Sequence, residues 1–149
     1  MHIDLTDGEF ERLLKVVYLG EMLMNDWVPE EKWNDEQKTA ADLLYMLCDR
    51  AERTPAERLV MPHPEDGAMI PSDAMRIETD PYVRSYDDEV FWEELVRRLA
   101  RRDLEEEYGR EEAETMNDAR YFASEEPLLK YYGEEVESRG VDRLRIKED

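Results

Sequence analysis

The chain has 149 residues, of which 40 are aspartate or glutamate and 20 are lysine or arginine, giving a formal net charge of -20 at pH 7. This length is typical of one domain with one hydrophobic core, and we expect a single acidic α-helical domain over residues 1–149. The charge disfavours binding to nucleic acid and to anionic membranes, because like charges repel within a Debye length.

The first predicted helix runs from about Asp7 to Asn25. Thr6 and Glu9 have the spacing of a capping box, in which each side chain binds a free backbone N–H at the helix start. Apolar residues fall on both sides of this helix: one stripe is Phe10, Leu13, Leu14, Val17 and Met24, and the other is Val16, Leu19 and Leu23. Such a helix is expected at the centre of the domain or between the domain and a second subunit.

The second predicted helix is capped by Asn34 or Asp35 and reaches about Arg53. Its apolar face consists of Ala40, Leu43, Leu44, Leu47, Cys48 and Ala51. The pair Thr54-Pro55 is typical of a helix cap followed by proline in the first turn, so a short third helix is expected to reach about Met61.

Helical periodicity is lost from Pro62 to Tyr86, a stretch that contains Pro62, Pro64, Pro71, Pro81 and Gly67. A connection of this length without regular structure is uncommon in a compact domain. We expect either an ordered wrap over the core or a mobile binding loop. The anchors of an ordered wrap would be Met69, Ile70, Met75 and Ile77.

A long helix is predicted from Asp87 or Asp88 to about Tyr108, where Gly109 ends it. Its expected buried stripe is Phe91, Trp92, Leu95, Val96 and Leu99. A weaker helical pattern follows over residues 110–122.

The last predicted helix is capped by Ser124, takes Pro127 in its first turn and stops at Gly140. The alternation from Val141 to Lys147 predicts one short C-terminal strand. The predicted fold is therefore mainly α: an irregular bundle of four to five helices with a long proline-rich connection.

One basic run interrupts the acidic background, formed by Arg97, Arg98, Arg101 and Arg102. Each arginine lies four residues from a glutamate, the spacing of ion pairs on an exposed helix. We interpret the run as a solvated helix face. The alternative is a site for an anion or a carboxylate.

Candidate metal ligands are few. His63 stands between two prolines and lacks a partner at the spacing of known two-histidine motifs, so we interpret it as an exposed loop histidine. Glu111, Glu114 and Asp118 could share one helix face and hold Mg²⁺ or Mn²⁺ through carboxylate oxygens. Such spacings also recur by chance in a chain with 40 acidic residues.

Two carboxylates stand out by their helical phase. Glu21 projects at nearly the angle of the apolar stripe of its helix, and Asp103 falls within the stripe of the long helix. Both side chains are expected to be buried, where a carboxylate must be paired, hydrogen-bonded, protonated or metal-bound. The alternative is that water reaches them near a helix end, or that they pair with an arginine such as Arg12 or Arg102.

The sequence contains no recognisable catalytic motif around its serines or around Cys48, which is the only cysteine and therefore excludes an internal disulfide. Its acidic N-terminus is unlike a secretory signal. We expect a non-catalytic cytoplasmic protein without a cofactor that acts by protein–protein association, including self-association, or binds another protein with a basic surface. The alternative is a Mg²⁺- or Mn²⁺-dependent hydrolase that uses helix-borne carboxylates.

Overall fold

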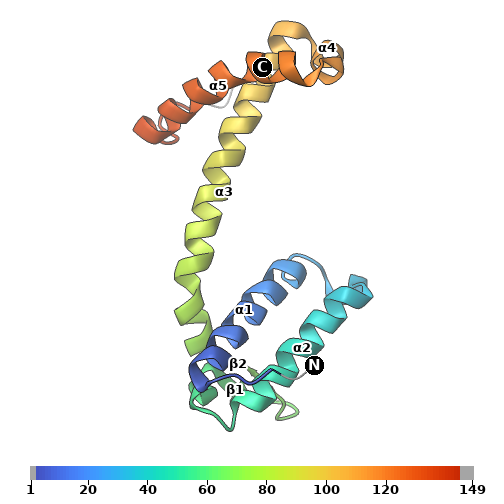
Figure 1. Cartoon of the computed structure of the whole chain (residues 1–149), viewed down its shortest axis with the longest axis vertical. Helices are drawn as coiled ribbons and strands as arrows, with labels where there is room; N and C mark the ends of the chain where they lie inside the picture. Colours follow the sequence, from blue (N-terminus) through green and yellow to red (C-terminus); the bar gives the residue numbers. More distant parts are fainter. Residues whose placement is uncertain (1–2, 145–149) are drawn as a thin grey trace. The chain divides into compact units, whose positions relative to one another are not determined.

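The computed structural model describes residues 3–144 and is mainly helical, as the sequence predicts (Figure 1). Backbone contacts divide the chain into two compact units, Met1–Arg84 and Ser85–Asp149. The prediction of one domain stays a prediction, because contacts alone do not measure whether the two units unfold together. Among the described residues, no helix is both long and apolar enough to cross a membrane.

The first unit begins with two helices that pack side by side, α1 (Asp7–Asn25) and α2 (Asp35–Ala51) (Figure 1). A capping box starts each of them, as the sequence predicts for α1. The Glu9 carboxylate accepts a hydrogen bond from the Thr6 backbone N–H at 2.8 Å. Asn34 and Gln37 form the equivalent pair at the start of α2. A short 3₁₀ turn, η1 (Glu30–Lys32), lies in the connection between the two helices.

A second 3₁₀ turn and a small hairpin follow α2. The predicted third helix is shorter and tighter than expected: it is the 3₁₀ turn η2 (Pro55–Leu59), in which the Thr54 hydroxyl accepts from the Ala56 N–H at 3.1 Å. Strands β1 (Val60–Pro62) and β2 (Met69–Pro71) then pair antiparallel. Gly67 lies in their turn with a φ of +76°, a conformation that favours glycine.

Helix α3 (Asp73–Tyr108) overturns the prediction that residues 62–86 lack regular structure. It contains Pro81, which cannot donate a backbone hydrogen bond to the carbonyl of Ile77. Pro81 and Ile77 are both exposed, so water can hydrate that carbonyl. On the opposite side, Met75 and Thr79 are buried, and this burial stabilises the start of the helix.

The core of the first unit lies where α1, α2, η2 and the start of α3 meet. Its buried residues are Leu14, Leu44, Cys48, Ala51, Ala56, Leu59, Val60 and Met75. Of the anchors predicted for the 62–86 stretch, Met75 is fully buried, Met69 packs against this core, and Ile77 is exposed.

The second unit contains the C-terminal part of α3, the short helix α4 (Arg110–Thr115) and α5 (Asp118–Arg139). Gly109 and Gly140 end helices as predicted, with φ values of +83° and +53°. The prediction of Ser124 as a helix cap is wrong: Asn117 caps α5, and its side chain accepts from the Arg120 N–H at 3.0 Å.

The stripe predicted for the second unit is partly buried: Trp92, Leu95, Val96 and Leu99 are half-buried. Phe91 is 51% exposed, while the fully buried side chains on this part of α3 are Ala100 and Leu104. Where a C-terminal strand was predicted, Val141 to Arg143 form a turn. Residues 145–147 of that predicted strand lie outside the described residues.

Candidate functional site

Glu21 lies on α1 and is half-buried, at a position where its helical phase predicts a buried side chain. Its Oε1 accepts a hydrogen bond from the side-chain Nδ2 of Asn25 at 2.9 Å, and the same Nδ2 donates to the Gln37 backbone carbonyl at 3.1 Å. Asn25 is only 2% exposed, and its Oδ1 is buried without a hydrogen-bond partner. The carboxylate therefore supports a polar link between the end of α1 and the start of α2.

Asp103 is also half-buried, with 29% of its side chain exposed. The neighbouring Arg102 binds it through two nitrogens at 2.6 and 2.8 Å, and the Tyr132 hydroxyl of α5 donates to its other oxygen. Burial alone would raise the pKa of Asp103, but these hydrogen bonds from Tyr132 and Arg102 outweigh it and lower that pKa. Asp103 is thus an ionised carboxylate that joins α3 to α5, which indicates a structural role.

The arginine run forms the solvated face that its spacing predicts. Arg98 binds Glu94 at 2.8 Å and Arg101 binds Glu105 at 2.8 Å. Arg97 lies 3.9 Å from Glu93. The pair expected between Arg102 and Glu106 is replaced by the contact of Arg102 with Asp103. Since every arginine of the run has a carboxylate partner, the face offers little uncompensated positive charge to an anion.

The predicted carboxylate group on residues 111–118 does not share one helix face. Glu111 and Glu114 belong to α4, whereas Asp118 starts α5 after a break at Met116 and Asn117. Glu114 and Asp118 line one hollow of about 240 Å³, and Glu111 is not among its lining residues. Within residues 3–144, no three histidine, cysteine, aspartate or glutamate side chains gather in a way that could hold a metal ion.

His63 and Cys48 have ordinary structural surroundings. His63 lies in the hairpin connection, where its Nδ1 accepts from the Glu65 N–H at 3.4 Å and lies 3.2 Å from the Asp66 carboxylate. It is half-buried, not exposed as the sequence predicts. Burial raises the pKa of the Cys48 thiol to about 11, so this cysteine is protonated at neutral pH and is a poor nucleophile.

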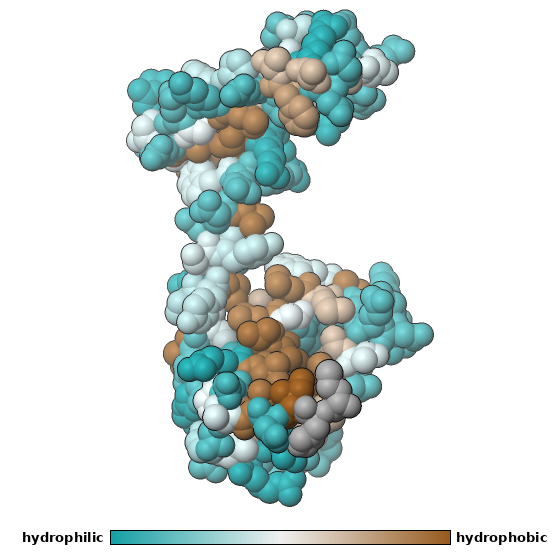
Figure 2. Space-filling view, in the orientation of Figure 1, coloured by the Kyte–Doolittle hydropathy of each residue, from teal (hydrophilic) through white to brown (hydrophobic). Residues whose placement is uncertain are grey.

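An apolar strip of α1 is left uncovered in the first unit. It consists of Leu13, Val16, Leu23, Met24 and, directly after the helix, Trp27, and we call it the α1 stripe. Val16 is 65% exposed, Leu23 57% and Trp27 87%. Apolar surface gathers over α1 and α2 in Figure 2, and Leu43 of α2 is exposed as well. The sequence predicts an all-round apolar α1, and the structure exposes members of both predicted stripes, Leu13 and Met24 from one and Val16 and Leu23 from the other.

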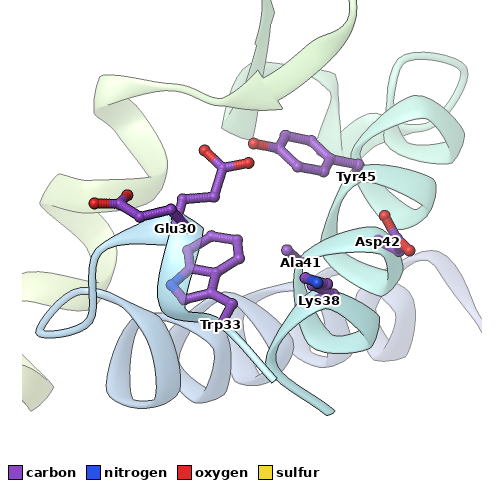
Figure 3. Close-up of a pocket in the computed structure, with 7 residues that line it drawn as sticks. Glu30, Trp33, Lys38, Ala41, Asp42 and Tyr45 are labelled. Atoms are coloured by element: carbon purple, nitrogen blue, oxygen red, sulfur yellow. The ribbon is translucent and has the colours of Figure 1, made fainter. Parts of the chain in front are cut away.

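A cleft of about 540 Å³ lies beside α2 in the same unit (Figure 3). Its lining residues are Glu30, Glu31, Trp33, Lys38, Ala41, Asp42 and Tyr45. Sequence reasoning missed this cleft, because Trp33 and Tyr45 come from different elements and no motif links them. The sequence feature that could have pointed to the cleft is Trp33, which follows the acidic pair Glu30 and Glu31 closely along the chain.

The chain was compared with models of protein families, with curated proteins and with solved structures. None of them matches. Function is therefore inferred from the exposed α1 stripe and from the cleft, two features of the first unit's surface that its packing leaves unexplained.

Proposed function

We propose that this is a non-catalytic cytoplasmic protein that works by association, and that its first partner is a second copy of itself bound through the α1 stripe. The observation that carries the proposal is the exposure of large apolar side chains along one side of a well-formed helix. Contiguous apolar patches of more than a few hundred Å² on a soluble protein mark interaction sites.

The charge pattern supports a second copy as the occupant of the stripe. Two copies of a chain with a net charge of -20 repel one another over most of their surface. The segment Arg12–Gly20 contains no acidic residue and carries two bases, Arg12 and Lys15. Two copies can therefore approach along this part of α1 without placing carboxylates against each other.

Symmetry also favours self-association. In a two-fold dimer each copy contributes the same patch, so the stripe of one copy is buried against the stripe of the other. A specific interface removes roughly 800 Å² from each partner. Large apolar side chains are exposed on α2 as well, among them Leu43, which is 41% exposed.

Substitutions at Val16 test this proposal by size-exclusion chromatography with light scattering. Val16→Glu and Val16→Lys each place a charge in the apolar contact and are expected to raise the dimer dissociation constant by about tenfold or more, from the loss of one buried side chain. The lysine variant lowers the net repulsion between copies. If Val16→Lys also dimerises more weakly, the cause is therefore the lost apolar contact and not added negative charge.

Ile77→Glu is the matched control, because Ile77 is 63% exposed on α3 and lies outside the stripe. It should dimerise like the original chain. Circular dichroism establishes that all three variants keep their helix content. Unchanged dimerisation of both Val16 variants, or equal loss in the Ile77 variant, would contradict the proposed interface.

A further inference from the structure

The cleft beside α2 has aromatic side chains on two of its walls. Trp33 follows η1 and Tyr45 belongs to α2, and Figure 3 shows the two rings extending into the same opening from different elements. Trp33 is half-buried, and its indole N–H donates to the Val28 carbonyl at 2.8 Å. Since this bond uses the only donor of the indole, the ring is held in place and offers its π surface to the cleft.

The charge around these rings is negative. Glu30, Glu31 and Asp42 line the cleft against a single base, Lys38. Burial raises the pKa of Tyr45, and the negative charges of Glu21 and Glu30 raise it further. The carboxylates therefore place a negative potential at an aromatic wall, and this combination attracts cations.

A second hollow lies beside Tyr45. This tyrosine also lines that hollow, of about 390 Å³, together with His63, Asp66, Ala68 and Ile70. Another carboxylate, that of Asp66, thus lies beyond the ring on the side of the hairpin. The two hollows share Tyr45 as a lining residue, and we refer to them together as the groove.

We propose that this groove binds arginine or lysine side chains from a basic segment of another protein. Aromatic faces and carboxylates together recognise organic cations, because the cation gains both the ring quadrupole and the ionic contact. A bare metal ion is disfavoured by the aromatic walls and by the lack of three gathered ligands in residues 3–144. A second copy is a poor occupant, because it would bring an acidic surface against a groove that is itself acidic.

This inference goes beyond the proposed self-association and uses different residues. The α1 stripe is apolar and lacks acidic side chains, whereas the groove is acidic and aromatic. A monomeric Val16→Glu chain keeps every groove residue. Measuring peptide binding to the groove in that variant separates a failure of this proposal from a failure of the proposed dimer.

The test is a titration of ¹⁵N-labelled full-length protein in which nuclear magnetic resonance monitors the indole N–H groups of the tryptophans. The chain has three tryptophans, and Trp33→Phe assigns the Trp33 resonance. The probes are N-acetyl-arginine amide, a short peptide with two arginines, and the same peptide with glutamate at those positions. The arginine peptide is expected to shift the Trp33 resonance saturably, at a concentration at least about tenfold lower than the single amide needs, since two linked contacts reinforce each other.

Two variants locate the site. Tyr45→Ala and Glu30→Gln are each expected to raise the dissociation constant of the arginine peptide by about five- to tenfold, the range of one cation–π or ionic contact. Tyr86→Ala is the matched control, because Tyr86 is a similarly exposed tyrosine beside acidic residues on α3, and it should leave the affinity unchanged. Circular dichroism checks the fold of each variant.

Four results would overturn the proposal. The Trp33 resonance could stay unshifted, or move linearly and equally with sodium chloride at matched ionic strength, which would reflect screening alone. The affinity could be the same in Tyr45→Ala as in the original chain. The single amide could also saturate as tightly as the peptide, which would assign the cleft to a small organic cation instead of a protein segment.

Discussion

Glu11 of α1 accepts two hydrogen bonds from the Arg58 guanidinium of η2, at 2.8 and 2.9 Å. Lys15 binds the same carboxylate at 2.8 Å and also reaches Glu78 of α3 at 2.7 Å. Arg58 lies 3.2 Å from Glu78 as well, so the four charges alternate in one network. Three elements of the first unit are joined by it.

This network predicts how the stability of the first unit depends on pH. The hydrogen bonds from Arg58 and then Lys15 lower the pKa of Glu11 from 4.5 to about 2. A carboxylate with a depressed folded-state pKa stabilises the fold fully above its unfolded pKa. That contribution is lost as the pH falls from about 4.5 through about 2.

Glu11→Gln is therefore expected to lower the free energy of unfolding by about 1 kcal/mol at pH 7, the size of a partly exposed ion pair with good geometry. Urea unfolding at pH 7 and near pH 2 measures the difference between this variant and the original chain. The difference should shrink towards zero at the lower pH. Asp49→Asn removes an exposed carboxylate of α2 and is the control. A pH-independent effect of Glu11→Gln would contradict this interpretation.

A double-mutant cycle tests the structural role of Asp103. Asp103→Asn weakens the hydrogen bond between α3 and α5 by removing the charge of its acceptor, Tyr132→Phe removes the bond, and each is expected to destabilise the protein by about 1 kcal/mol. Arg102 is 56% exposed, so its charge stays hydrated when Asp103→Asn removes the carboxylate. The loss of stability is therefore far below that caused by breaking a buried ion pair. The two effects should couple by at least about 0.5 kcal/mol. Simple additivity would show that the hydrogen bond does not stabilise the fold.

Hydrogen exchange tests the correction made for residues 62–86. The amide of Thr79 lies past the first turn of α3, on its buried side, and should exchange as slowly as those of α2. Amides of the hairpin turn around Gly67 should exchange faster. Rapid exchange at Thr79 would restore the interpretation of this stretch as a mobile loop.

Local signals predicted the start of α1 and the ends of α3 and α5, whereas the starts predicted at Asp87 or Asp88 and at Ser124 are wrong. The box at Thr6 and Glu9 and the glycines at positions 109 and 140 act within one turn of backbone, so the sequence around them is sufficient. The errors come from proline. Pro81 and Pro127 both lie inside helices, and whether a helix tolerates a proline depends on packing and solvent exposure that the local sequence does not contain.

The candidate sites show the same limit. Helical phase drew attention to Glu21 and Asp103, and both have hydrogen-bonding partners in the structure, but phase did not give their half-buried state. It also did not identify Asn25 or Tyr132 as those partners, because each contact depends on how helices end or pack. The cleft at Trp33 and Tyr45 forms only when η1 folds beside α2, so spacing along the chain could not reveal it.

Duplex DNA binding should be undetectable at physiological salt. Phosphate contacts dominate non-specific affinity, and the net charge of -20 opposes them. The arginine run adds little, since its members already contact carboxylates. A gel shift at low micromolar protein that weakens with salt and disappears on replacing Arg97 and Arg101 would contradict this prediction.

The central claim is that the uncovered α1 stripe makes this chain associate with itself, and sedimentation equilibrium of the original chain tests it most directly. The measurement covers protein concentrations from low to high micromolar at two ionic strengths. We predict a mass that rises above the monomer mass of 17.8 kDa with concentration. Association should strengthen at the higher ionic strength, because salt screens the repulsion between two acidic chains while leaving the apolar contact. A mass that stays at 17.8 kDa across the whole range, at both ionic strengths, would contradict the account.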